Sequence, residues 1–136
     1  ETAHGLGPCI DGTVPELFAP MIKKMGEFLS WAGESVYGTI GGGNSALCPG
    51  WCWKNGFASV TVSLADPSIH YLHVTTAPDA DTLILNTNGP DILEVSDLRT
   101  GRPHPFLDRG CLEIYDIDWA DVETVGTKTF KVKVAL

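Results

Sequence analysis

Near the start of the chain, apolar side chains recur every three or four residues, which is the period of one face of an α-helix. Thr13 and Glu16 precede this pattern with Pro15 between them, an order typical of a capping box at a helix start. Gly33 is a typical helix end. The pattern predicts one amphipathic helix over residues 14–32. Its apolar stripe consists of Leu17, Phe18, Met21, Ile22, Met25, Phe28, Leu29 and Ala32.

From Phe57 onward the period changes to two, as in strands whose side chains alternate between two faces. Turn-forming pairs such as Asp66-Pro67 and Asn88-Gly89 separate the β-rich runs. Short strands with turns between them and no helical period are typical of an antiparallel sandwich. The predicted fold is mainly β, an antiparallel β-sandwich preceded by one amphipathic α-helix. The runs with strand character are 57–64, 69–76, 82–85, 92–98, 111–117 and 127–134.

Glycines mark the boundaries between three predicted parts of the chain. Residues 41–56 are rich in glycine and form a predicted irregular connection between residues 1–40, a loop and the helix, and the sandwich of residues 57–136. This connection carries Trp51 and Trp53, which is unusual for a plain linker. Because the apolar C–H faces of sugars stack on aromatic rings, both are candidate carbohydrate-binding residues. The interpretation we prefer from the sequence is that these indoles pack the helix against the sandwich.

The net charge of the chain limits the kinds of partner that it is expected to bind. The chain has 9 basic and 17 acidic residues and a net charge of −8. It has no basic cluster of the kind that displaces counterions from phosphate, so we predict no nucleic-acid partner. The acidic balance also argues against anionic membrane surfaces, and no run of about 18 apolar residues predicts a membrane span. Neutral partners such as uncharged sugars remain compatible with this charge.

Histidines and cysteines are the candidate metal and thiol groups. His70 and His73 lie three residues apart in a predicted strand, so their rings point to opposite faces and cannot share an ion. We therefore predict no metal site, and no cofactor. Cys48 and Cys52 are separated by three residues instead of the two of a redox motif. We predict either a short disulfide between them or two free thiols in a loop.

Paired carboxylates are the candidate acid–base groups. Asp116 and Asp118, and likewise Asp79 and Asp81, share a face wherever the chain is extended, and carboxylate pairs can hydrolyse glycosides. The sequence shows neither burial nor a neighbour that would separate their pKa values, so we interpret all four as surface residues. The chain also lacks a nucleophile elbow and a phosphate-binding loop. We predict no catalytic residue.

Three segments in the first 39 residues resemble, in order, the end of the catalytic barrel in family 29 α-L-fucosidases. Phe28 stands where that family usually has tryptophan. More weakly, residues 71–74 and 98–101 resemble a strand and a turn of the domain that follows the barrel. The resemblance implies a last barrel helix followed by a C-terminal β-sandwich. The ordered segments are Gly7-Pro8-Cys9-Ile10-Asp11-Gly12-Thr13-Val14-Pro15, Met25-Gly26-Glu27-Phe28-Leu29 and Gly33-Glu34-Ser35-Val36-Tyr37-Gly38-Thr39.

The activity of the family depends on catalytic residues that have no counterpart in this chain. The family's enzymes are retaining exo-glycosidases that release α-L-fucose with an Asp nucleophile and a Glu or similar acid/base. Both groups lie upstream in the barrel, and a barrel of about 250 residues does not fit in this chain. Residues 1–6 are also a poor match to the family's apolar strand before the Gly-Pro loop.

The expected function is therefore a non-catalytic C-terminal accessory domain or fragment of an α-L-fucosidase-like glycoside hydrolase. It would support a catalytic barrel, carried by the parent enzyme or by a separate chain, with fucosylated glycans as candidate ligands. The alternative is a stand-alone, lectin-like carbohydrate-binding module that uses Trp51 and Trp53. Because the chain starts at Glu1 without Met, we expect a removed leader or a longer parent, and a secreted or lysosome-like compartment.

Overall fold

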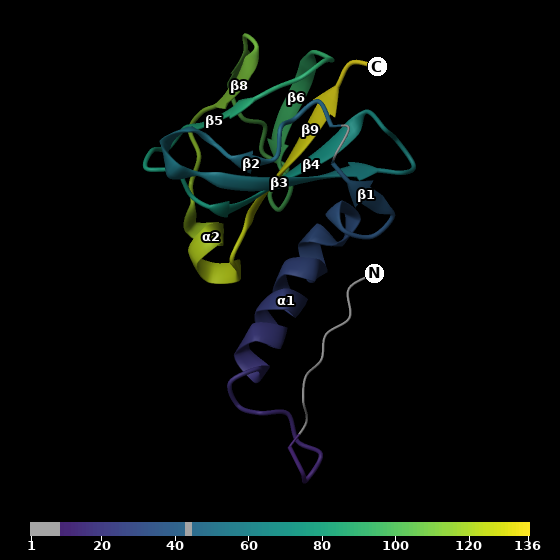
Figure 1. Ribbon diagram of the computed structural model, residues 1–136, viewed down its shortest axis with the longest axis vertical. Coiled ribbons are helices and arrows are strands. Elements are labelled where there is room, and N and C mark those ends of the chain that lie inside the picture. The colour runs from purple at the N-terminus through teal and green to yellow at the C-terminus, as the bar shows by residue number, and fades with distance from the viewer. Residues whose placement is uncertain (1–8, 43–44) are drawn as a thin grey trace.

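The computed structural model describes residues 9–42 and 45–136 as two facing β-sheets from which a helix projects (Figure 1). Among these residues, no helix is long and apolar enough to span a membrane. The helices are α1 (Ala19–Ala32) and α2 (Ala120–Val125), with short 3₁₀ turns η1 (Gly33–Ser35) and η2 (Trp53–Asn55). The strands are β1 (Thr39–Gly41), β2 (Gly50–Trp51), β3 (Phe57–Ser63), β4 (Ile69–Thr76), β5 (Leu83–Asn86), β6 (Ile92–Asp97), β7 (Phe106–Asp108), β8 (Cys111–Ile114) and β9 (Lys128–Val134).

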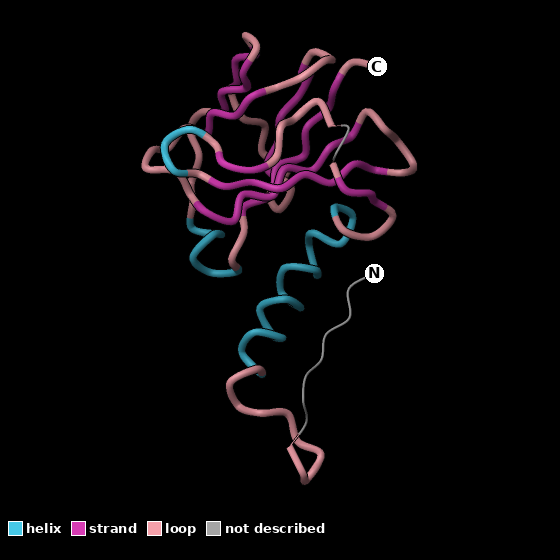
Figure 2. Tube along the Cα trace, viewed as in Figure 1, coloured by secondary structure: helices cyan, strands magenta, loops and turns pink. Residues whose placement is uncertain are grey.

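The strands pair antiparallel in a large and a small sheet. The large sheet has the order β1-β3-β4-β9-β6, and β2 pairs with the end of β3 that β1 leaves free. The small sheet has the order β5-β8-β7. Figure 2 shows the strands gathered at one end of the molecule and α1 at the other. The predicted mainly β, antiparallel architecture with a preceding helix is confirmed.

The core lies between the two sheets, and the middle strand β4 is covered on both faces. Leu72 and Val74 are fully buried and belong to the apolar cluster that the sheets share. The alternate residues Tyr71 and His73 are also buried, and the ring of His73 lies 6.3 Å from that of Phe28 on α1. The large sheet is therefore the middle layer, with the small sheet on one side and the end of α1 on the other.

Helix α1 begins five residues later than its sequence pattern predicts. Thr13 does not cap the helix: its hydroxyl and amide both donate to the carboxylate of Asp11, at 2.7 and 3.0 Å. Pro20 explains the late start, because a proline lacks the amide proton of the helical bond and its ring clashes with the carbonyl four residues earlier. Such a residue fits only in the first turn, where α1 has it.

The shortest elements are those that the sequence pattern misses. β1 and β2 pair with β3, so the glycine-rich connection carries strand pairs at its ends. The predicted strand 111–117 stops at Ile114, since Asp116 has a φ of 59°. Helix α2 follows and ends at Gly126, whose φ of 87° suits a glycine. Helix α2 thereby lies beside the charged side chains at the end of β6 and at the start of β9.

Candidate functional site

The apolar stripe of α1 is buried at one end and exposed at the other. Ala32 is fully buried, and Phe28 and Leu29 are half-buried against the large sheet and α2. Towards the start of the helix the same stripe faces solvent: Met21 is 59% exposed and Met25 is 42% exposed. Figure 1 shows this part of α1 projecting beyond the sheets. We call the exposed part, made of Met21, Ile22 and Met25 of α1 and of Leu17 just before it, the α1 apolar face.

A buried histidine fastens the end of α1 to the large sheet. The hydroxyl of Thr61 donates to the carbonyl of Ser35 at 2.6 Å, so it can only accept from Nε2 of His73, 3.1 Å away. Nδ1 of His73 then accepts from the hydroxyl of Thr129 at 3.2 Å, as a neutral imidazole can. Burial lowers the pKa of His73 to about 4, although the carbonyl of Ser35 acts in the opposite direction.

Beside it, a polar contact ties η1 to the outer face of the same sheet. The Glu34 carboxylate accepts from the hydroxyl of Tyr71 and from the ammonium of Lys131, both at 3.0 Å. Burial, together with the hydrogen bond to Glu34, raises the pKa of Tyr71 to about 12. These contacts hold the end of α1 in place, whereas none of them reaches the α1 apolar face.

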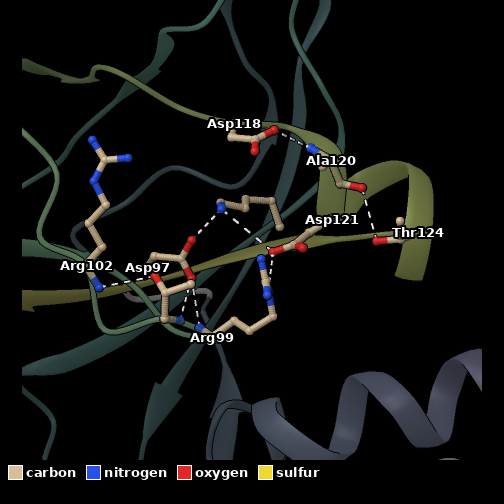
Figure 3. Close-up of polar contacts among 9 residues, drawn as sticks. Asp97, Arg99, Arg102, Asp118, Ala120, Asp121 and Thr124 are labelled. Carbon is tan, nitrogen blue, oxygen red and sulfur yellow. Dashed lines mark hydrogen bonds and ion pairs between the residues drawn. The ribbon is translucent and has the colours of Figure 1, made fainter.

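A buried charged cluster joins α2 to the ends of β6 and β9 (Figure 3). The ammonium of Lys128 donates to the carboxylate of Asp97 and lies 3.7 Å from that of Asp121, and Lys128 and Asp97 are each only 5% exposed. Arg99 donates to Asp121 at 2.9 Å. Burial by itself raises the pKa of Asp97, but the hydrogen bonds from Lys128 and from the amides of Thr100 and Arg99 outweigh it and lower the pKa.

The predicted carboxylate pairs do not form a buried acid–base site. Asp116 and Asp118 are exposed. Asp116 forms an ion pair with Arg102, and Asp118 accepts a hydrogen bond from the amide of Ala120 at the start of α2. Asp79 and Asp81 are also exposed. The interpretation of all four as surface residues is therefore correct.

The two candidate tryptophans are exposed, so the expectation that they pack the helix against the sandwich is wrong. Trp51 is 77% exposed and Trp53 is 57% exposed. The edge of the Trp51 ring packs on Phe57, with the centroids 5.2 Å apart. The turn behind them is strained, because Lys54 and Asn55 have φ values of 58° and 65°. We call residues 51–55 the tryptophan loop.

Three hydrogen bonds brace the tryptophan loop, one of them from the amide of Asp79 to the carbonyl of Lys54 at 2.9 Å. The side-chain amide of Asn55 donates to the carboxylate of Asp79 at 2.6 Å. The amide of Cys52 donates to the carbonyl of Gly56 at 2.8 Å. The strained turn is therefore fixed, and both indoles are presented to solvent by a braced backbone.

The histidines of β4 lie apart, as their spacing predicts. Nδ1 of His70 pairs with the hydroxyl of Ser45 at 2.6 Å and Nε2 pairs with the carbonyl of Pro67 at 3.1 Å, whereas His73 faces α1. In the part of the chain that the structure describes, no group of three metal-ligating side chains comes together.

All four cysteines lie within the described residues and are free thiols. Burial raises the pKa of Cys52, whose thiol lies 3.7 Å from the carbonyl of Gly50. A disulfide between Cys48 and Cys52 is not formed here and stays a prediction for an oxidising compartment.

Comparison with known proteins gives the class to which this fold belongs. No protein-family model and no curated protein matches the chain. Solved structures do match, and α-L-fucosidases are among them, so the sandwich with its leading helix is a fold that these enzymes contain.

The Thermotoga maritima α-fucosidase in complex with a mechanism-based inhibitor matches 95% of this chain and 29% of its own, with a TM-score of 0.72 and 21% identity. The GH29 α-L-fucosidase from Bacteroides thetaiotaomicron, trapped as a covalent intermediate, matches with a TM-score of 0.73 and 20% identity. It covers 97% of this chain and 28% of its own. This chain thus spans less than a third of the enzymes it matches, and the resemblance seen in the sequence is confirmed as a shared fold.

Proposed function

We propose that this chain is the accessory domain of an α-L-fucosidase-like glycoside hydrolase and that it docks on the catalytic module through the α1 apolar face. The observation that carries the proposal is the divided stripe of α1, in which Phe28 and Leu29 pack on the sandwich while Met21 and Met25 face water. Contiguous exposed apolar side chains of this kind mark interaction surfaces in folded proteins. The described part of the sandwich does not cover this part of the helix, which supports a second module as its partner.

The matched enzymes suggest which protein the second module would resemble. More than two thirds of their length lies outside the part that aligns with this chain. That remainder would supply both the docking surface and the catalytic carboxylates, whose counterparts we do not find among the exposed aspartates here. We propose the same arrangement whether the catalytic module belongs to a longer parent chain or to a separate one, and we place it in a secreted or lysosome-like compartment.

The docking proposal can be tested by supplying a catalytic module in trans. The T. maritima α-fucosidase would be truncated by the region that this chain matches, and its melting temperature and its hydrolysis of a chromogenic α-L-fucoside measured with and without the chain. We expect the chain alone to hydrolyse nothing, and to raise the melting temperature and activity of the truncated enzyme.

The matched variants separate docking from unspecific stabilisation. Met21→Lys/Met25→Lys places charges on the α1 apolar face, whereas Leu93→Lys places a charge on an exposed position of β6, away from α1. We expect the first to abolish the effect on the truncated enzyme and the second to retain it. Equal effects of all three proteins, or fucoside hydrolysis by the isolated chain, would contradict the proposal.

A second candidate function is carbohydrate binding by the tryptophan loop, and the exposure of both indoles favours it. Indole faces at a braced surface loop can stack on the C–H faces of sugar rings without rearrangement. Calorimetry against fucosylated oligosaccharides tests it directly, with Trp51→Ala and Trp53→Ala as variants. Binding that persists in both variants would rule out the tryptophan loop as the site.

A further inference from the structure

A small pocket lined by polar and charged residues lies beside the charged cluster, and it shares no residue with the α1 apolar face or the tryptophan loop. Its volume is about 120 Å³. The buried pair of Lys128 and Asp97 lies at its base, and Arg102 and Asp118, both exposed, lie at its rim. Figure 3 shows Asp97, Arg102 and Asp118 in this part of the molecule.

The pocket offers hydrogen-bond donors on one side. Lys128 has three ammonium protons, and its carboxylate partners are Asp97 and Asp121. Arg102 uses one guanidinium nitrogen on Asp116, and Arg99 uses its Nε on Asp121, which leaves further N–H groups on each.

It offers acceptors on the other side. One carboxylate oxygen of Asp118 accepts from the amide of Ala120 at 3.0 Å, and the other has no partner among the described residues. His104 also lines the pocket and is only 6% exposed. Its Nδ1 donates to the carbonyl of Tyr115 at 3.1 Å, so Nε2 carries a lone pair.

Within the described part of the chain, Nε2 of His104 is buried without a hydrogen-bond partner. Buried polar atoms without a partner are rare, and each one costs about 1–3 kcal/mol. The nitrogen itself is covered, so the accessible groups of the pocket are those of its other lining residues.

The mixture of donors and acceptors selects one class of ligand. An anion would meet the carboxylates of Asp97 and Asp118, and a cation would meet Arg99, Arg102 and Lys128. A hydroxyl group donates one hydrogen bond and accepts two, so a neutral ligand that carries hydroxyl groups can satisfy both sides. With about 30 Å³ for each water molecule, the volume corresponds to about four waters, which is the size of the hydroxyl-bearing edge of one sugar ring.

We propose that this pocket binds vicinal hydroxyl groups of a neutral polyol such as one sugar residue, with Arg102 and Lys128 donating and Asp118 accepting. The site is independent of the docking function of α1, because it uses other residues on another part of the sandwich. It is also distinct from stacking on Trp51, since it recognises hydroxyl groups and not an apolar ring face.

The test is an NMR titration of the full ¹⁵N-labelled chain with L-fucose and D-glucose, each compared with sodium sulfate. We expect a saturable, millimolar response to at least one sugar, seen in the amides of Thr100 and Arg102. Because charge-assisted hydrogen bonds are lost, Arg102→Ala and Asp118→Asn should each weaken binding by at least about tenfold.

Matched controls make the result decisive. Arg109→Ala removes an exposed arginine outside the pocket, and Trp51→Ala removes the alternative stacking site, so both should bind as the original chain does. The amide spectrum of each variant shows whether it is folded. No saturable response to either sugar, loss of binding in Trp51→Ala, or sulfate binding at the same amides would overturn the proposal.

Discussion

The sandwich and helix α1 both have regularly spaced apolar residues, but only those of the sandwich are covered by other parts of the same chain. The central strand β4 has cover on both faces, from the small sheet and from the end of α1. Helix α1 has cover only over its last turns. The difference teaches that an apolar stripe identifies which side of an element needs a partner, but not whether that partner lies in the same chain.

The sandwich and helix α1 are also expected to differ in stability. An isolated helix shorter than about 12–15 residues is marginal in water, so the 14 residues of α1 depend on packing for their order. Gly26 weakens it further, by about 1 kcal/mol relative to alanine. We therefore expect the two regions to respond very differently to mutation, pH and hydrogen exchange.

The largest effect is expected in the shared core. Phe130 is fully buried, and its ring lies 5.3 Å from His104 and 6.4 Å from Trp119. Phe130→Ala should lower the free energy of unfolding by about 3–5 kcal/mol, because it removes buried area and leaves a cavity. Urea unfolding measures this, with Phe130→Leu as the milder control. A loss below about 1 kcal/mol would show that β9 is not part of a tightly packed core.

A somewhat smaller effect is expected in the charged cluster. Lys128→Met should lower the free energy of unfolding by about 3 kcal/mol, because it leaves the buried carboxylate of Asp97 without its cation. Adding Asp97→Asn should restore part of the loss, since the neutral amide keeps an oxygen for the amides of Arg99 and Thr100. If the double variant is less stable than Lys128→Met, Asp97 is held by something other than Lys128.

Acidification should weaken the attachment of α1 next. His73 has a pKa of about 4 in the folded chain and 6.5 in the unfolded one, so its stabilising contribution is complete above pH 6.5. Between pH 7 and pH 5 the unfolded state gains a proton that the folded state does not, and about 2 kcal/mol of stability should be lost. His73→Gln should lose less over the same range. Identical pH profiles of the two proteins would show that folding does not lower the pKa of His73.

The smallest effect on stability is expected on the α1 apolar face. Met21→Lys and Met25→Lys should each change the free energy of unfolding of the isolated chain by less than about 0.5 kcal/mol, as exposed substitutions do. Urea unfolding of the two variants tests this beside Leu72→Lys, which is buried and should prevent folding. A large loss for Met25→Lys would mean that the α1 apolar face packs within this chain.

Sequence reasoning predicts the long elements and misses the short ones for a physical reason. β3 and β9 are seven residues long and show a clear period of two. β2 has two residues and β7 has three, too few for any period to show. The late start of α1 could have been predicted, because Pro20 excludes a helix that begins at residue 14.

The candidate sites were less predictable than the fold. Lys128 and Asp97 are 31 residues apart, and charged side chains at the ends of strands resemble solvated ones in sequence. The exposure of Trp51 depends on β2 pairing with the end of β3, and this two-residue pair has no sequence signal of its own. Burial of polar groups and exposure of apolar ones arise from tertiary contacts, so neither follows from local pattern.

The most direct test of the account is amide hydrogen exchange along the isolated chain, read residue by residue. If α1 depends on a catalytic module, its amides between Lys23 and Glu27 should exchange through openings that cost far less than those of β4 and β9. Adding the truncated α-fucosidase should then slow exchange in α1 and leave the sandwich unchanged. Protection of α1 equal to that of β4 in the isolated chain would contradict the account, because the helix would then need no partner.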